Sequence, residues 1–299
     1  MQTRSVFLGL LGLASFVAAC ASAATQRDGF EEPAPGETTQ TEAGPGTTSS
    51  SGGLGGPQGP TEGGRPEIAE VFGHSKTTLY RLDPKTKGVT VVGDFKGCED
   101  VIDIALDESS TLIAAGYETL YKVDPATAVC TEIAKSAQYP NSLSFVPKGT
   151  VDPNEEALVG YDDGDYLRID VKTGAVKKIG TLNAGNVISS GDIVSVKGGA
   201  TYLTVKGGEC SDYDCLVEID PKTGKMLKNW GSIEHKKVFG LSFWGGKIYG
   251  FDDTGNLFEV AFGTKQLATT AIPIPSKPTD LSFWGAGSTT SAPLVPSPQ

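Results

Sequence analysis

The sequence predicts an all-β fold, because one β-hairpin pattern occurs five times along the chain. Each copy has a strand of alternating apolar and polar residues, a tight turn and a second strand. The turns follow one another at intervals of 41, 46, 50 and 41 residues, and short strands repeated every ~40 to 50 residues are typical of β-propeller blades. The copies read LYRLDPKTKG from Leu79, LYKVDPATAV from Leu120, YLRIDVKTGA from Tyr166, LVEIDPKTGK from Leu216 and LFEVAFGTKQ from Leu257.

The first hairpin shows how each copy turns. Arg81 and Leu82 fall on opposite faces of a half-buried strand. Asp83 is then placed to accept hydrogen bonds from backbone amides ahead of it, and Pro84 fixes the φ angle that a type I turn needs. Gly88 is expected to take the left-handed backbone conformation.

The two ends of the repeat region predict the number of blades. A second pattern precedes each hairpin after the first and is expected to form the innermost strand of a blade. The first hairpin lacks this strand and the last inner strand lacks a hairpin, so joining them completes one blade and removes the open sheet edges. We therefore predict a five-bladed β-propeller closed by N- and C-terminal strands. The inner strands are DIALD from Asp103, SLSFV from Ser142, DIVSV from Asp192, GLSFW from Gly240 and DLSFW from Asp280.

Blade 2 is predicted strand by strand, at Val101–Leu106, Thr111–Ala115, Thr119–Val123 and Val129–Ala134. A helical solenoid of the same period is the alternative. No stretch has the amphipathic helical pattern that it requires.

The chain divides into four segments by composition. Residues 1–19 have the form of an export signal, with Arg4 before an apolar run too short to span a membrane. Residues 20–66 are rich in Gly, Pro, Ser and Thr and are expected to be a disordered tether. Residues 67–287 form the predicted propeller, and residues 288–299 are expected to be a disordered tail.

The segment from Val17 to Cys20 resembles the lipobox of bacterial lipoproteins, in which the Cys becomes the lipidated first residue of the mature chain. This resemblance implies that Cys20 anchors the protein in a membrane. Because Ala21 follows the Cys instead of Asp, it further implies the outer membrane, on its periplasmic or surface side. An ordinary cleaved signal is the alternative, since Ala-x-Ala occurs at 19–21 and at 21–23.

The repeated turns resemble those of the bacterial repeat propellers, such as quinoprotein-like and YVTN-type repeats with an L-Y-x-I-D-P-x-T-G turn. The resemblance covers the whole predicted ring and implies the propeller fold. Its members include dehydrogenases, scaffolds and binding proteins, so it implies no particular function. No quinone-site pattern is present in this sequence.

The charge of the chain argues against nucleic acid as a partner. The formal net charge is −11 and the pI is about 4.7, whereas nucleic-acid binding needs a clustered basic face. The chain also lacks the Gly-x-Ser-x-Gly, His-Glu-x-x-His and P-loop motifs. Its two histidines, His74 and His235, fall in predicted loops. We therefore expect no catalytic activity.

Three acidic residues begin predicted inner strands, where their side chains could face the mouth of the central channel. These candidate metal ligands are Asp103, Asp192 and Asp280, and calcium is the cofactor they would suit. Alternatively, each Asp bonds the backbone of the neighbouring blade and sets the start of its strand. The second interpretation is favoured, because blades 3 and 5 have Ser142 and Gly240 at this place.

The loops between the second and third strands of each blade should share one face of the ring, which we name the loop face. They begin at Gly73, Gly116, Tyr161, Gly207 and Phe251, and they are rich in carboxylates and aromatic residues. A face of variable loops is the usual binding surface of a rigid ring. The Asp-rich loops could hold calcium, although such sequences also make good hairpin turns. Candidate ligand residues are Tyr161, Asp162, Asp163, Asp165, Asp212, Tyr213, Asp214, Asp252, Asp253 and His74.

Four cysteines remain once Cys20 is assigned to lipid, and in an oxidising envelope they should pair. Cys210 and Cys215 flank a short loop and are expected to form a disulfide. Cys98 and Cys130 fall at opposite ends of predicted blade 2, and a disulfide needs Cα atoms within ~7 Å. Either the strand frame slips there or these two thiols stay free.

These observations predict a monomeric, lipid-anchored binding protein of the cell envelope that recognises an envelope protein or ligand without catalysis. The alternative from another class is a calcium-dependent hydrolase or lactonase acting at the mouth of the channel. A third hypothesis is a structural scaffold that uses the edge of the ring.

Overall fold

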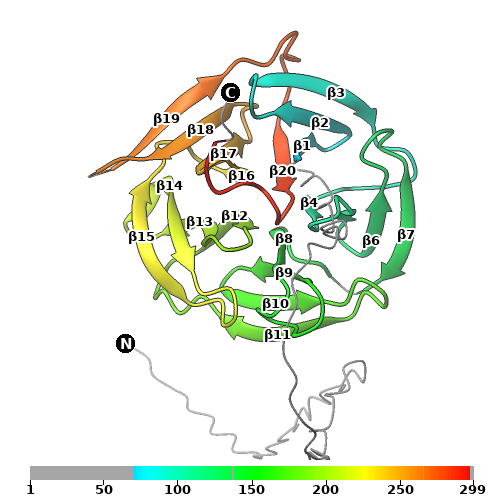
Figure 1. The fold of residues 1–299 in the computed structure, drawn as a ribbon, viewed down its shortest axis with the longest axis horizontal. Helices are drawn as coiled ribbons and strands as arrows, with labels where there is room; N and C mark the ends of the chain where they lie inside the picture. The colour runs from blue at the N-terminus through cyan, green and yellow to red at the C-terminus, as the bar shows by residue number, and fades with distance from the viewer. Residues whose placement is uncertain (1–69, 137, 265, 297–299) are drawn as a thin grey trace, which may run out of the picture. The chain divides into compact units, whose positions relative to one another are not determined.

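The structure is a computed structural model that describes residues 70–136, 138–264 and 266–296, all within one compact unit. These residues form five four-stranded antiparallel sheets around a common axis (Figure 1). The predicted all-β fold and its five blades are confirmed. The predicted signal segment, Cys20 and the tether lie outside the described residues. Within those residues, no helix is long and apolar enough to cross a membrane.

The strands of each blade follow one another from the axis outwards. Blade 1 has β20 (Phe283–Ser288), β1 (Val71–Ser75), β2 (Thr78–Asp83) and β3 (Gly88–Asp94). Blade 2 has β4 (Asp103–Leu106), β5 (Leu112–Ala115), β6 (Thr119–Val123) and β7 (Cys130–Lys135). Blade 3 has β8 (Leu143–Val146), β9 (Ala157–Asp162), β10 (Asp165–Ile169) and β11 (Val176–Thr181). Blade 4 has β12 (Ile188–Ser195), β13 (Thr201–Gly207), β14 (Cys210–Ile219) and β15 (Met226–Ser232). Blade 5 has β16 (Val238–Trp244), β17 (Lys247–Asp252), β18 (Leu257–Phe262) and β19 (Leu267–Ile272).

Blade 1 closes the ring as predicted, with β20 from the C-terminal part paired to β1. The predicted register of its inner strand was wrong. DLSFW was expected to form this strand, but β20 covers 283–288 and places Gly285 opposite His74. The reason is crowding at the axis, because a Cβ added to Gly285 would lie 2.1 Å from Oδ1 of Asp103. Only glycine fits between blades 1 and 2 at this level.

The prediction of a disordered tail was also wrong for residues 288–296. Residue 288 ends β20, and we name residues 289–296 the strap. Thr289, Thr290 and Ala292 are buried. In Figure 1 the strap is the red segment that leaves β20 and runs over blade 5. The strap forms hydrogen bonds with four blades. The Ser291 hydroxyl donates to the carbonyl of Glu108, and the Thr290 hydroxyl donates to the carboxylate of Glu156. The carbonyls of Thr290 and Pro293 accept from the amides of Lys197 and Gly245. The strap therefore lies across the ring on the face of the repeated turns.

The hydrophobic core lies between neighbouring blades. One buried cluster joins blades 1 and 2, another blades 2 and 3, another blades 3 and 4, and the largest joins blade 5 to blades 4 and 1. Burying each large apolar side chain contributes roughly 1.5–3 kcal/mol. The inter-blade contacts therefore hold the ring together.

The repeated turns form as predicted, with one correction. The Asp83 carboxylate accepts hydrogen bonds from the amides of Lys85 and Thr86, at 2.9 and 3.3 Å. The left-handed residue is Lys87, with φ of 61°, and not Gly88. Lys87 also forms an ion pair with Glu259 of blade 5, at 2.6 Å.

Cys98 and Cys130 are joined by a disulfide with Cα atoms 5.4 Å apart, so the expectation that the predicted strand positions keep them apart was wrong. The predicted strands of blade 2 are present, and Cys98 lies in the connection between β3 and β4. The chain leaving β3 first runs beside β7, where Lys96 exchanges hydrogen bonds with Ala128 and Cys130. Only after this contact does it cross to β4.

Candidate functional site

Two predicted metal ligands, Asp103 and Asp192, meet at the axis of the ring, where both side chains are fully buried. The Asp103 carboxylate accepts hydrogen bonds from the amides of Ile104, at 2.8 Å, and Leu143 in blade 3, at 2.6 Å. The Asp192 carboxylate accepts hydrogen bonds from the amide of Ile193 in its own strand and from the amide of Leu241 in blade 5, the latter at 2.5 Å. Each carboxyl thus bonds the backbone of the next blade, which is the interpretation that the sequence favoured.

The electrostatics of the axial carboxyls follow from this burial. Loss of solvent raises the pKa of both Asp103 and Asp192 well above its ordinary value, and the Asp192 charge raises that of Asp103 further. The third predicted ligand, Asp280, is exposed and precedes β20. The described residues contain no group of three His, Cys, Asp or Glu side chains that could hold a metal ion. The predicted calcium site is therefore not assembled.

His74 is fully buried on β1 and is not part of an exposed loop, contrary to the prediction. Its Nδ1 lies 2.9 Å from the carbonyl oxygen of Ser75 and carries the hydrogen of that bond. Its Nε2 has no hydrogen-bond partner within the part of the chain that is described. Burial lowers the pKa of His74 to about 4, so the ring is neutral at pH 7.

The Asp-rich loop of blade 3 is a hairpin turn. β9 ends at Asp162 and β10 begins at Asp165, with Asp163 in the left-handed conformation at φ of 51°. Asp162 and Asp163 are exposed, and Asp165 forms an ion pair with Lys178 at 2.6 Å. Tyr161 is buried in the core instead, where its hydroxyl donates to the carbonyl of blade 4 residue Gly224.

The two Asp side chains of the blade 5 segment are also bonded to neighbouring residues of the fold. Asp252 is buried and accepts hydrogen bonds from the amides of Thr254 and Asn256 and from His235, whose Nδ1 is 2.8 Å away. Although burial opposes ionisation, these hydrogen bonds lower the pKa of Asp252 to about 2. The His235 ring stacks on Phe258 with centroids 3.7 Å apart. The neighbouring Asp253 pairs with Lys237 at 2.8 Å.

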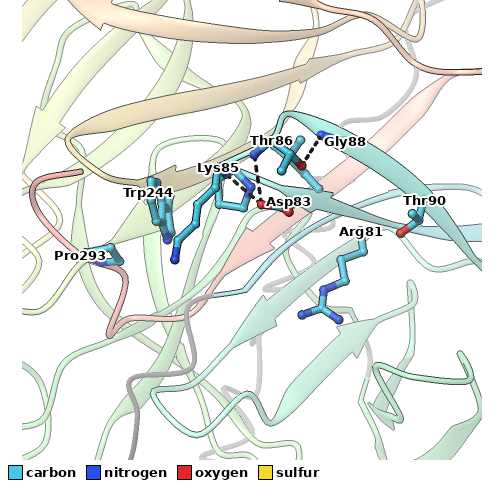
Figure 2. Close-up of a pocket in the computed structure, with 10 residues that line it drawn as sticks. Arg81, Asp83, Lys85, Thr86, Gly88, Thr90, Trp244 and Pro293 are labelled. Carbon is cyan, nitrogen blue, oxygen red and sulfur yellow. Dashed lines mark hydrogen bonds between the residues drawn. The ribbon is translucent and has the colours of Figure 1, made fainter. Parts of the chain in front are cut away.

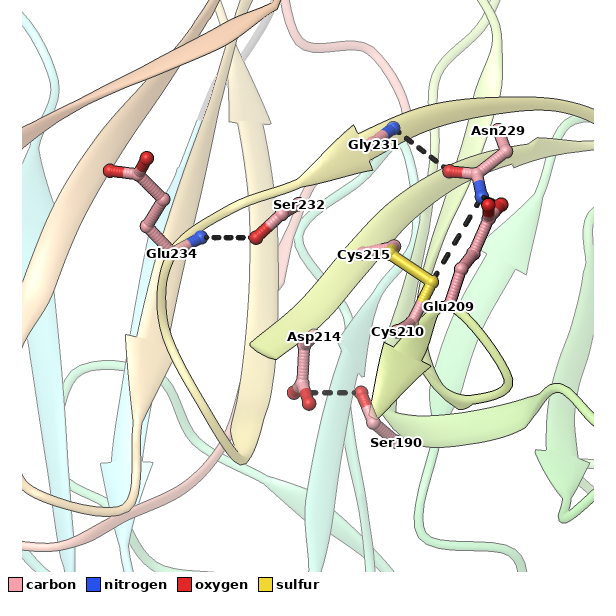
Figure 3. The surroundings of a disulfide bond; sticks show 9 residues. All are labelled: Ser190, Glu209, Cys210, Asp214, Cys215, Asn229, Gly231, Ser232 and Glu234. Carbon is pink, nitrogen blue, oxygen red and sulfur yellow. Dashed lines mark hydrogen bonds between the residues drawn. A yellow bond between two sulfur atoms is a disulfide. The ribbon is translucent and has the colours of Figure 1, made fainter. Parts of the chain in front are cut away.

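In blade 4, the predicted disulfide between Cys210 and Cys215 is present, with Cα atoms 5.5 Å apart. The segment between the two Cys was predicted as a loop, but it lies within β14, where it bulges against β13 and carries Asp212, Tyr213 and Asp214. Figure 3 shows the disulfide and Asp214. Asp214 is buried, accepts hydrogen bonds from Ser190 Oγ and the amide of Val238, and has a pKa raised by burial. Asp212 is exposed, and Tyr213 is 46% exposed.

Tyr117 in the corresponding loop of blade 2 was not predicted as a ligand residue. It is 55% exposed, and its backbone carbonyl accepts a hydrogen bond from the backbone amide of Tyr139 at 2.9 Å. Of the nine tyrosines in the chain, only Tyr117 and Tyr213 are exposed. Both lie on the loop face. The tyrosine in the GYE sequence of this loop was the feature from which Tyr117 could have been predicted as a ligand residue.

The concave sites described below are shallow, and two of them lie beside repeated turns. A pocket of about 650 Å³ beside the blade 1 turn is lined by Arg81, Lys85, Trp244 and Pro293, among others (Figure 2). A similar one of about 590 Å³ lies beside the blade 2 turn. Because this hollow occurs beside two copies of the turn, it follows from the hairpin geometry. On the loop face, a smaller pocket of about 360 Å³ includes Trp284 and the exposed Asp280.

Comparisons with known proteins concern only the fold. No protein-family model and no curated protein matches the chain. Among solved structures, a protein studied for the de novo evolutionary emergence of a symmetrical protein aligns with a TM-score of 0.50 and 14% identity, over 77% of this chain and 100% of that one. A protein of unknown function from Bacteroides caccae aligns with a TM-score of 0.37 and 12% identity, over 72% of this chain and 77% of that one. The first likeness supports the propeller fold, and neither bears on function.

Proposed function

We propose that this chain is a non-catalytic binding protein, held at the bacterial outer membrane by lipid on Cys20, that contacts an envelope protein through its loop face. The observation that carries the proposal is the placement of the two exposed tyrosines on this face, with Tyr117 between β5 and β6 and Tyr213 in the bulge of β14 that the disulfide closes. Tyrosine offers a large contact area at a small entropic cost and is enriched at the centres of protein interfaces.

The remaining candidate residues support binding over catalysis. Asp103, Asp192, Asp214 and Asp252 bond backbone amides and hold strands or loops in place. A general base or a metal ligand needs a free, accessible lone pair near the substrate. The calcium-dependent hydrolase is therefore disfavoured, since two of its three candidate ligands, Asp103 and Asp192, are used within the ring.

The character of the loop face favours a protein partner over a small molecule. Its pocket is shallow, whereas small-molecule sites are concave and enclose most of the ligand. The exposed Asp162, Asp163 and Asp212 add negative charge between and beside the two tyrosines. Such charges affect the rate of association and its salt dependence more than the affinity.

Photo-crosslinking of the full-length protein in intact envelopes tests the proposal. A photoreactive residue replaces Tyr117 or Tyr213, and matched controls carry it at Val91 and Leu227, which are 64% and 63% exposed on outer strands. We expect the same protein adduct from both loop-face positions and none from the controls. An adduct that forms only at the outer strands would contradict the loop-face proposal.

The lipid anchor has a separate test. Cys20→Ala should move the protein from the membrane fraction to the soluble fraction, because stable anchoring depends on the acyl chains. A variant that stays in the membrane pellet after a high-salt wash would disprove the anchor without affecting the loop-face proposal.

A further inference from the structure

The axial carboxyls connect four of the five blades. Asp103 extends from blade 2 to the Leu143 amide in blade 3, and Asp192 extends from blade 4 to the Leu241 amide in blade 5. The two carboxyls also lie within hydrogen-bond reach of each other across the axis. A hydrogen bond between them therefore joins blade 2 directly to blade 4, which are not neighbours in the ring.

Such a bond needs one proton, because two ionised carboxylates carry only acceptor oxygens. Two like charges that share a buried site cannot both remain ionised at low cost, and one carboxyl keeps its proton. The protonated group can then donate a short, charge-assisted hydrogen bond to the ionised one. The backbone amides of Leu143 and Leu241 remain bound to the other lone pairs.

The neighbouring titratable groups do not replace this proton. His74 approaches from β1, where its Nε2 and Oδ1 of Asp103 lie 2.5 and 2.1 Å from the position that a Cβ on Gly285 would take. His74 is neutral at pH 7, because burial lowers its pKa to about 4. Asp214 stands near β12, but its carboxylate is bound to Ser190 and to the Val238 amide.

We propose that Asp103 and Asp192 hold one proton between their carboxyls at neutral pH, and that this proton is a clasp across the ring axis which alkaline pH opens. Loss of the proton leaves two buried negative charges facing each other. The blades that the clasp joins then separate more easily, so alkaline pH loosens the ring.

The sign of the pH dependence follows from linkage. The folded protein binds one proton that the unfolded chain, with ordinary Asp pKa values near 3.9, has released above about pH 5. Stability from the clasp is therefore largest at low pH and is lost as pH rises through the pKa of the axial pair. Replacing Asp192 by Asn removes the second carboxylate and its charge, so the variant has a smaller slope.

Melting temperatures of the full-length protein in detergent test the clasp from pH 5.5 to 9. Asp192→Asn lowers the melting temperature at every pH, because the amide cannot accept both backbone hydrogen bonds that the carboxylate does. The informative quantity is the difference between wild type and variant, in which the titration of His74 and other shared groups cancels. We expect this difference to shrink by roughly 5 °C or more, since a tenfold loss in the folding equilibrium corresponds to about 3–5 °C for a domain of this size.

Asp280→Asn is the matched control, because it removes one exposed carboxylate away from the axis. The difference in melting temperature between Asp280→Asn and wild type should stay constant with pH. A constant difference for Asp192→Asn would overturn the clasp. If that variant does not fold, infrared spectroscopy of the wild type decides the question, since the clasp requires a protonated carboxyl band at pH 7 that disappears on unfolding, and absence of the band would overturn it.

Discussion

The carboxylates of the repeated turns and those of the axis are the same chemical group in opposite surroundings. Asp220 represents the turns, where it accepts hydrogen bonds from Thr223 Oγ1, at 2.7 Å, and from the Lys222 amide, at 2.9 Å. These bonds lower its pKa, with the Thr223 hydroxyl as the main cause. Asp103 is fully buried, bonds the next blade, and has a raised pKa because burial disfavours its charge.

The comparison shows that position in the ring decides what an Asp does. A turn carboxylate stabilises a contact within one hairpin and contributes most when it is ionised. An axial carboxyl stabilises contacts between blades and contributes most when the pair holds a proton. The two sets should therefore respond to mutation with different magnitudes and to pH with opposite signs.

The largest expected effect is that of Asp103→Ala. The substitution leaves the buried amides of Ile104 and Leu143 without a partner, and an unsatisfied buried donor costs ~1–3 kcal/mol. We expect the free energy of unfolding to fall by about 3 kcal/mol or more in urea denaturation. Asp280→Ala, at an exposed site, should change it by less than ~0.5 kcal/mol. Equal losses of unfolding free energy at Asp103 and Asp280 would show that the axial carboxyl stabilises the fold no more than an exposed one.

His74 gives a second effect at the axis, in the acid range. Its folded pKa of about 4 lies below the ordinary histidine pKa of 6.5, so the unfolded chain takes up a proton first as the pH falls. Stability is therefore lost between about pH 6.5 and 4, by roughly 3 kcal/mol when ~1.4 kcal/mol is counted per pKa unit. The measurement is urea denaturation across this range for wild type and His74→Phe. A variant with the same acid loss as wild type would place the cause elsewhere.

The smallest expected effect is that of Asp220→Ala at the turn of blade 4. It removes local hydrogen bonds that are partly exposed, and we expect a loss of about 1 kcal/mol at pH 7. Because the folded pKa is lowered, this contribution is present above the unfolded pKa and disappears as pH falls through the folded pKa. Unfolding at pH 7 and pH 2 checks both points. A loss that persists at pH 2 would mean that the charge of Asp220 is not involved.

The sequence was sufficient for features that depend on local patterns. Strand alternation and turn chemistry placed the four strands of blade 2 within two residues of β4 to β7. The same reasoning recovered the number of blades and their closure. It failed where contacts between distant segments decide, as at Gly285, whose neighbour is Asp103 in another blade, and at Cys98, which lies beside β7. The strap was missed for the same reason, because its partners belong to four blades.

The candidate site was predicted less well than the fold. Composition marked the Asp-rich segments as loops, but Asp214 lies within β14 and Asp252 is the last residue of β17. Composition could not show that these two side chains bond backbone amides. It also could not show that Tyr161 is core while Tyr213 is exposed. A side chain's accessibility depends on the neighbouring blade, and one strand's pattern does not contain that information.

The axial carboxyls hold the ring, and we propose that the loop-face tyrosines contact the partner. The most direct measurement is the affinity of the cross-linked partner, once purified, for the full-length protein and its variants. Replacing both Tyr117 and Tyr213 by Ser should weaken binding at least ~10-fold, as expected for exposed aromatic residues at the centre of an interface, with the melting temperature unchanged. Replacing Lys85 and Val129 by Ser on the turn face should leave the affinity within about twofold. Unchanged affinity for the tyrosine variant, with a loss for the turn-face variant, would contradict the account.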